Sequence, residues 1–148
     1  MSPDLSQTKL LDGLTAEQRE RIARIGAVKR FSRGELIFRE DSPGEELFFV
    51  MSGRVDILIK LKSDEQRIAT HQAGDSFGEF AAMDCSRRSA TAMAATDVEV
   101  VAIQGPTFYR LLSEDTAIGY AVMKNLCTVL CDRLKNANLQ WRNAIYWG

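Results

Sequence analysis

Residues 77–91 read FGEFAAMDCSRRSAT, and this segment carries more chemical information than any other part of the chain. Gly78 lets the backbone approach a bound group closely, and a helical turn after it would present free N–H groups to an anion. Arg88 offers a planar pair of donors to a phosphate, and Ser89 adds a hydroxyl. The carboxylate of Glu79 suits a sugar hydroxyl of the same ligand, because it accepts hydrogen bonds.

Short β-rich segments lie on both sides of residues 77–91 and are separated by turn residues. The turn residues are Gly34, Pro43, Gly44, Gly53 and Gly74. Regular short strands of this kind predict an antiparallel barrel or double-sheet roll and not a parallel α/β sheet. Alternate residues of 55–61 are apolar, which predicts that one face of this strand points inward. The expected strands are 35–38, 47–51, 55–61, 66–71, 89–94 and 99–103.

Helical periodicity marks both ends of the chain. The pair Thr15 and Gln18 has the spacing of a capping box, which predicts a helix within residues 8–29. After the β-rich part, apolar residues return at helical intervals and predict a short helix at 106–112 and a long one at 116–143. We therefore expect a mainly β protein with flanking helices, in one domain that spans 1–148. Its parts are a helical segment at 1–29, an antiparallel jelly roll or double-stranded β-helix at 30–104, and two C-terminal helices at 105–148.

The composition excludes several classes of protein. The chain has 148 residues, 45% of them hydrophobic and 26% charged, with a formal net charge of −1, which argues against disorder and against unspecific nucleic-acid binding. No apolar run is long enough to span a bilayer, and the N-terminus has no secretion signal. Cys85, Cys127 and Cys131 form no C-x-x-C pair, which fits a reducing compartment. We expect a soluble cytoplasmic protein with no membrane partner.

These motifs together resemble the cyclic nucleotide-binding domain family, which includes catabolite-activator-type regulators and regulatory subunits of protein kinase A. The phosphate-binding cassette of that family reads approximately F-G-E-x-A-L, a spacer, and then R-[AST]-A. The matching residues here are Phe77, Gly78, Glu79, Ala81, Arg88, Ser89 and Ala90. The resemblance covers about residues 10 to 138, and it implies the β-roll with an N-terminal helix and C-terminal hinge and lid helices.

The resemblance also implies roles for single residues. Arg88 would pair with the exocyclic oxygens of the cyclic phosphate, while Glu79 and the backbone of Gly78 would bind the ribose 2′-hydroxyl. Ser89 and the backbone N–H of Ala90 would complete the phosphate site.

Other positions would surround the base. Ile57 and Ile68 would line the base side of the roll, and Ala137, Asn138 or Trp141 of the last helix would act as the lid. The complete expected ligand-binding set is Phe77, Gly78, Glu79, Phe80, Arg88, Ser89, Ala90, Ile57, Ile68 and Asn138.

The sequence gives little support to a metal site or to a catalytic function. His71 is the only histidine and has no second ligand at metal-binding spacing, so we expect a turn residue at the rim of the roll. Cys127 and Cys131 lie four residues apart, which predicts packing or a helix-pair seam and not a metal site. Arg87 is expected to be solvated or paired with Asp84. The sequence therefore predicts no catalytic residue, no metal and no cofactor; the protein is not expected to be an enzyme.

The predicted function is a regulatory sensor that binds a cyclic nucleotide and moves its last helix in response. We expect cAMP, with cGMP as the alternative ligand, and cyclic dinucleotides remain open. A second reading stays open as well: a degenerate β-roll that acts as a protein–protein interaction module without nucleotide. Ala82 stands where the family has Leu and Arg87 where it often has Pro, and both departures keep that alternative open.

The long helix carries two sets of residues that repeat every seven positions. The sets are Cys127, Leu134 and Trp141, and Met123, Leu130, Ala137 and Ala144. This double repeat predicts a two-stranded helix seam and hence a homodimer through the C-terminal helix. Because no DNA-binding module follows the last helix in the sequence, the output is expected to be a protein partner of unknown identity and not DNA.

Overall fold

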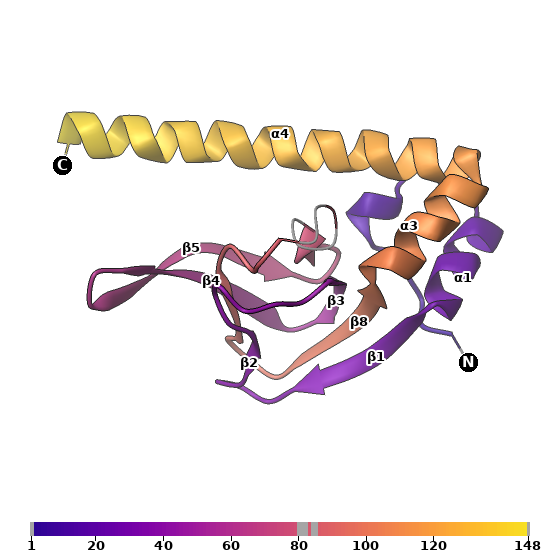
Figure 1. Cartoon of the computed structure of the whole chain (residues 1–148), viewed down its shortest axis with the longest axis horizontal. Helices are drawn as coiled ribbons and strands as arrows, with labels where there is room; N and C mark the ends of the chain where they lie inside the picture. The colour runs from indigo at the N-terminus through magenta and orange to yellow at the C-terminus, as the bar shows by residue number, and fades with distance from the viewer. Residues whose placement is uncertain (1, 80–82, 84–85, 148) are drawn as a thin grey trace.

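The computed structural model describes residues 2–79, 83 and 86–147. A β-roll lies beneath the long helix α4, and the shorter helices gather beside one end of the roll (Figure 1). The elements in chain order are η1 (Lys9–Leu11), α1 (Ala16–Arg24), β1 (Gly26–Phe31), β2 (Leu36–Phe38), β3 (Glu46–Ser52), β4 (Arg54–Leu61), β5 (Asp64–Gln72), β6 (Ser76–Phe77), β7 (Thr91–Ala94), β8 (Val98–Gln104), α3 (Gly105–Glu114) and α4 (Thr116–Trp147). The predicted fold class, a mainly β roll with flanking helices, is confirmed.

The roll consists of two four-stranded antiparallel sheets. Their strand orders are β1-β8-β3-β6 and β2-β7-β4-β5. A cluster of buried residues fills the space between the sheets: Phe48, Val50, Val55, Phe77, Ala92, Ala94, Val98, Val100 and Ala102. Alternation along β3 sends Phe49 to the opposite face, where it meets Phe108 of α3 at a ring-centroid distance of 6.5 Å. The first sheet therefore has a core on each of its faces.

The N-terminal helical segment ends earlier than the sequence predicts. The capping box is present, because the Thr15 hydroxyl accepts from the backbone N–H of Gln18 and the Gln18 side chain accepts from that of Thr15. Helix α1 nevertheless stops at Arg24, and strand β1 begins at Gly26 and pairs with β8 along its whole length. The prediction of helix up to residue 29 is wrong at its end. A side chain at position 26 would place its Cβ 2.6 Å from Val101, so glycine is needed for this pairing.

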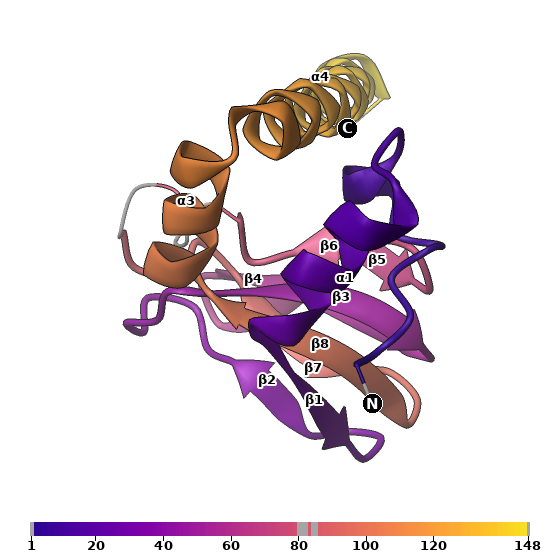
Figure 2. The same ribbon diagram turned by 90° about the vertical axis from the view of Figure 1, so that its right-hand side faces the viewer.

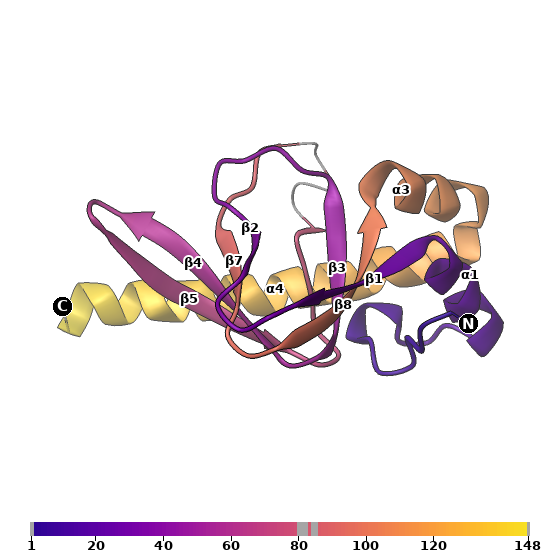
Figure 3. The same cartoon turned by 90° about the horizontal axis from the view of Figure 1, so that it is seen from below.

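The β4–β5 hairpin also differs from its prediction. Alternation over 55–61 predicts one inward face, and Val55 is fully buried, but Leu61 at the far end is 48% exposed. Strand β7 pairs with β4 only between Val55 and Leu58, so the rest of the hairpin is two-stranded and has no sheet to bury its apolar residues. The hairpin extends in the same direction as the C-terminal half of α4 (Figures 1 and 3).

Helix α4 is anchored over its first turns and free over the remainder. Ile118, Val122 and Leu126 are buried in the core that α4 shares with α1, α3 and η1, which surround its N-terminal end (Figure 2). The Asn125 amide donates to the carbonyl oxygens of Leu10 at 3.0 Å and Asp12 at 2.8 Å, which fixes α4 to η1.

The outer half of α4 is uncovered in the monomer. Leu134 is 62% exposed and Trp141 is 71% exposed. The helix runs to Trp147, four residues beyond its predicted end. Among the described residues, no helix is both long and apolar enough to cross a membrane.

Candidate functional site

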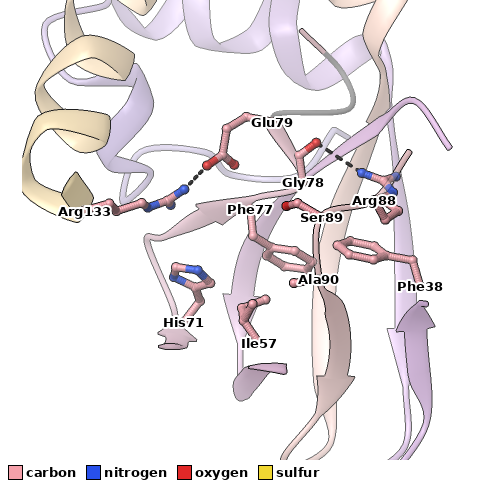
Figure 4. A pocket seen from close by; sticks show the side chains of 10 residues that line it. All are labelled: Phe38, Ile57, His71, Phe77, Gly78, Glu79, Arg88, Ser89, Ala90 and Arg133. Carbon is pink, nitrogen blue, oxygen red and sulfur yellow. Dashed lines mark hydrogen bonds and ion pairs between the residues drawn. The ribbon is translucent and has the colours of Figure 1, made fainter. Parts of the chain in front are cut away.

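A pocket opens between the β-roll and α4, and most of its walls come from the residues around the predicted cassette (Figure 4). The lining residues are Phe38, Ile57, His71, Phe77, Gly78, Glu79, Arg88, Ser89, Ala90 and Arg133. They line a hollow of about 80 Å³ that opens to solvent.

Gly78 shapes the entrance to this pocket. Strand β6 ends at Phe77, and Gly78 follows with a φ of +81°, a conformation that favours glycine. A Cβ at this position would lie 3.0 Å from both Arg88 Nη1 and the Glu46 carbonyl oxygen. Glycine therefore gives the Arg88 guanidinium the room to pack directly against the backbone.

Arg88 is buried, with only 5% of its surface exposed, and contacts hold it in place from several sides. Its backbone N–H donates to the Ser42 carbonyl at 2.9 Å, and its carbonyl accepts from the Asp41 N–H at 2.7 Å. Its Nη1 donates to the Gly78 carbonyl at 3.1 Å, and its guanidinium carbon lies 4.1 Å from the centroid of the Phe38 ring. Its Nε is buried and has no hydrogen-bond partner within 2–79, 83 and 86–147.

The charge of Arg88 is not balanced by a carboxylate contact. Burial lowers the pKa of Arg88, and the nearby Glu46 partly offsets this shift, but an arginine keeps its proton in proteins. The structure records no ion pair of Arg88 with the described residues. A buried cation without a counter-charge is costly unless an anion joins it, so this position suits an anionic ligand group.

Glu79 provides the opposite charge a short distance along the chain. It is 3% exposed and forms an ion pair with Arg133 of α4. Arg133 also donates to the Ser76 carbonyl at 2.6 Å, and burial lowers its pKa while Asp75 opposes that shift. The second carboxylate oxygen of Glu79, Oε2, is buried and has no hydrogen-bond partner in the described part of the chain. The pocket thus contains one unpartnered acceptor at Glu79 and one unpartnered donor at Arg88.

Sequence analysis missed Arg133, because several basic residues lie along α4 and only the crossing of the helix over β6 selects this one. It also missed Phe38, which supports the Arg88 guanidinium.

The strand predicted over 66–71 is confirmed, but the prediction of His71 as a turn residue is wrong. His71 belongs to strand β5, not to a turn, and it lines the pocket with a side chain only 13% exposed. Its ring stacks on Phe77 with centroids 6.0 Å apart and an interplanar angle of 5°. Burial and the neighbouring Arg133 lower its pKa to about 4, with Asp75 opposing them, so the imidazole is neutral at pH 7.

Most of the predicted binding residues line one pocket. Phe77, Gly78, Glu79, Arg88, Ser89, Ala90 and Ile57 all do so. Ile68 does not: the register of β4 and β5 shifts here, so that Ile68 has no partner residue and is 41% exposed. Asn138 does not either, because it lies beyond the point where α4 crosses the pocket, and the other lid candidates, Ala137 and Trp141, are exposed with it. Phe80 lies outside the described residues.

The structure also bears on the predictions for Arg87, for the cysteines and for a metal site. Arg87 Nε pairs with Asp41 Oδ1 at 3.0 Å, and Asp84, its predicted alternative partner, lies outside the described residues. Cys127 and Cys131 are exposed free thiols. No group of three metal-ligating side chains occurs within 2–79, 83 and 86–147.

The family of this chain follows from a comparison with known domains. Residues 28–115, more than half of the chain, match the family model of the cyclic nucleotide-binding domain. The chain belongs to the cyclic nucleotide-binding domain family. The match begins within β1 and ends just after α3, so it includes the β-roll from Val28 onward.

Particular relatives come from different kinds of protein. Glutaminase 1 of Bradyrhizobium diazoefficiens is 32% identical over 137 residues, which is 91% of this chain and 21% of that protein. A cAMP-dependent protein kinase regulatory subunit of Colletotrichum orbiculare is 32% identical over 108 residues, 73% of this chain and 27% of that protein. The chain therefore spans only about a fifth to a quarter of these relatives.

Solved structures show the same architecture. The crystal structure of Thermus thermophilus Catabolite Activator Protein superimposes with a TM-score of 0.80 at 28% identity and covers 91% of this chain and 62% of that one. The predicted resemblance to activator-type and kinase-regulatory domains is confirmed.

Proposed function

We propose that this protein is a regulatory domain that binds a cyclic nucleotide, with cAMP as its ligand, and performs no catalysis itself. One observation carries the proposal: Arg88 and Glu79 are buried in the same pocket, and each has a polar atom without a partner among the residues that the structure describes. Buried polar atoms are nearly always hydrogen-bonded, so an unpartnered donor and acceptor in one pocket indicate a ligand that satisfies both.

The two charges match two parts of a cyclic nucleotide. Arg88, with no carboxylate contact of its own, would bind the cyclic phosphate together with the Ser89 hydroxyl and the backbone N–H of Ala90. Glu79 Oε2 would accept a hydrogen bond from the ribose 2′-hydroxyl while Oε1 stays with Arg133. The base would then lie toward Ile57, on the side of the pocket away from Arg88 (Figure 4).

The ion pair of Arg133 with Glu79 would transmit ligand binding to α4. A ribose hydroxyl at Glu79 competes for the negative charge that holds Arg133, so it changes the free energy of the contact between the pocket and the helix. A ligand shifts such an equilibrium only through different affinities for the two helix positions, and this ion pair provides the difference. Movement of α4, with α3 as its hinge, would be the signal.

The free half of α4 supports a homodimer. Its exposed apolar residues Leu134 and Trp141 belong to the seven-residue repeat, and a repeat of this kind is self-complementary when two copies pack side by side. Dimerisation would cover these side chains. We further propose a cytoplasmic location and a protein as the recipient of the signal.

One observation favours a second function. Arg133 already reaches into the pocket and pairs with Glu79, so the chain's own side chain meets part of the need for a ligand there. A domain that kept this arrangement permanently would be a protein–protein interaction module that uses α4 as its contact surface and binds no nucleotide.

Titration calorimetry with cAMP, cGMP and a cyclic dinucleotide separates the two functions. We expect saturable binding of cAMP with one site per chain and weaker binding of the other two. Native mass spectrometry of the purified protein supplies an independent measurement, because a tightly held nucleotide adds its own mass. The absence of binding by all three nucleotides, together with an unliganded mass, contradicts the proposed function and favours the interaction module.

A further inference from the structure

His71 is the one neutral, hydrogen-bonding ring in the pocket. It extends from β5 toward the space that Ile57 and Arg133 also line, on the side away from Arg88 (Figure 4). Its ring is parallel to that of Phe77, which is itself stacked on Phe48 at a centroid distance of 5.0 Å. This series of rings fixes the imidazole plane, so its nitrogen atoms have defined positions.

The surroundings of His71 determine which ring nitrogen carries the proton. Nδ1 lies 3.7 Å from Asp75 Oδ2, and Asp75 is itself held by Lys9 at 2.8 Å and by the backbone N–H of Gln72 at 3.0 Å. A carboxylate beside Nδ1 favours the tautomer with the proton on that atom, which leaves a lone pair on Nε2. Burial and the positive charge of Arg133 keep the ring from taking a second proton.

The remaining polar groups on this side of the pocket are already engaged. Arg133 can only donate, and it is bound to Glu79 and to the Ser76 carbonyl. Ile57 and Phe77 are apolar. Glu79 Oε2 is assigned to the ribose in the proposed function, so among the described lining residues away from Arg88 the His71 ring is the acceptor that remains for the base.

We propose that His71 selects the base of a bound cyclic nucleotide, by accepting a hydrogen bond at Nε2 from the exocyclic amino group of a purine. This assignment deepens the proposed function and depends on it. The ring stack positions the acceptor, and Asp75 holds its tautomer. A base without an exocyclic amine would leave Nε2 unpaired and bind more weakly.

Calorimetry with matched ligands tests the assignment. cAMP is compared with the cyclic 3′,5′-phosphate of purine riboside, which lacks only the amino group; if cGMP binds more tightly than cAMP, cGMP is compared with cyclic IMP. We expect the ligand with the amine to bind about 2- to 10-fold more tightly, the range for one neutral hydrogen bond. His71→Phe keeps the ring stack and should reduce the ratio of the two ligand affinities to about 1. His71→Gln keeps an acceptor and should preserve part of it. Gln72→Leu, an exposed neighbour on β5, should leave the ratio unchanged.

Nitrogen NMR supplies a second test that does not depend on the variants. His71 is the only histidine of the chain, so its imidazole signals need no assignment. We expect the free protein to show a protonated Nδ1 and an unprotonated Nε2 at pH 7, and the Nε2 signal to move upfield when the ligand with the amine binds.

The outcomes separate the two levels of the proposal. If no cyclic nucleotide binds the wild-type chain, the proposed function falls and this assignment falls with it. If nucleotides bind but the two matched ligands have equal affinity, or His71→Phe retains the wild-type ratio, the proposed function stands and the role of His71 is overturned. A proton on Nε2 in the free protein overturns it as well.

Discussion

The guanidinium of Arg133 and the carboxylate of Glu79 form an ion pair that joins the middle of α4 to the floor of the pocket. The two residues are far apart in the sequence, and neither is held by the helical bundle that anchors the first turns of α4. Under the proposed function, this contact would couple the pocket to the helix.

Replacing Arg133 should destabilise the protein through its partner. Arg133→Ala leaves the Glu79 carboxylate, which is 3% exposed, without its cation, and we expect the free energy of unfolding to fall by about 3 kcal/mol. Urea denaturation measures this change. Arg142→Ala, at an exposed position further along α4, should cost less than about 0.5 kcal/mol. Adding Glu79→Gln to Arg133→Ala should restore part of the loss, and strictly additive effects of the two substitutions would contradict the pairing.

Arg88 should dominate the affinity for nucleotide. Arg88→Ala removes the only cation at the phosphate position and should weaken cAMP binding by about a hundredfold or more in calorimetry. Arg88→Lys should also weaken it, because a point charge cannot reproduce the two-pronged geometry of a guanidinium. The neighbouring Arg87→Ala is the matched control, since Arg87 is exposed and pairs with Asp41. Equal affinities of the Arg87 and Arg88 variants for cAMP would contradict the role of Arg88 in binding.

Stability should decrease below neutral pH because of His71. Burial lowers the pKa of His71 to about 4, whereas the unfolded chain has the ordinary value of 6.5, so the unfolded state takes up a proton first as the pH falls. The contribution of neutral His71 to the free energy of unfolding is therefore fully present above about pH 6.5 and is lost progressively down to about pH 4. We expect the free energy of unfolding to fall by about 2 kcal/mol between pH 7 and pH 5.

Urea denaturation at the two pH values measures this loss. His71→Gln should show a much smaller decrease over the same interval, because glutamine does not titrate. The same decrease in both proteins would mean that His71 is not the group responsible.

The outer half of α4 should mediate dimerisation. Leu134→Glu combined with Trp141→Glu places charges at two exposed positions of the seven-residue repeat and should convert a dimer into a monomer. Light scattering at tens of micromolar detects the change. Tyr146→Glu is the control, because Tyr146 is 75% exposed but lies outside the repeat. A wild-type protein that is already monomeric, or a dimer that survives the double substitution, would exclude this interface.

Local sequence signals predicted the parts of the fold that depend on local chemistry. The Thr15–Gln18 capping box starts α1 because its bonds join residues three apart. The cassette residues Gly78, Glu79 and Arg88 are close in sequence and line one pocket, as the spacing of the motif predicted.

Features that depend on distant contacts were not predictable in this way. Strand β1 has only exposed and half-buried residues, so it lacks the apolar pattern of a buried strand. The helical spacing of Ile22 and Ile25 also continues to Val28, which lies in β1. The pairing of β1 with β8 determines its conformation. A strand was predicted over 66–71, but β5 is largely polar because most of it lies in a two-stranded hairpin, so its pattern did not show that His71 lines the pocket. The position of Arg133 in the pocket depends on the path of α4 over the roll, which the sequence does not predict.

The bonds from Asn125 to the carbonyl oxygens of Leu10 and Asp12 make the start of α4 a pivot. From Leu126 to Trp147 the helix extends about 30 Å beyond this point as a stiff lever arm. A tilt of about 10° at the pivot would carry the far tip through about 5 Å, given the rise of 1.5 Å per residue. Arg133 contacts this arm about a third of the way along it, so in the proposed mechanism a displacement at Arg133 would be about three times larger at the tip of the helix.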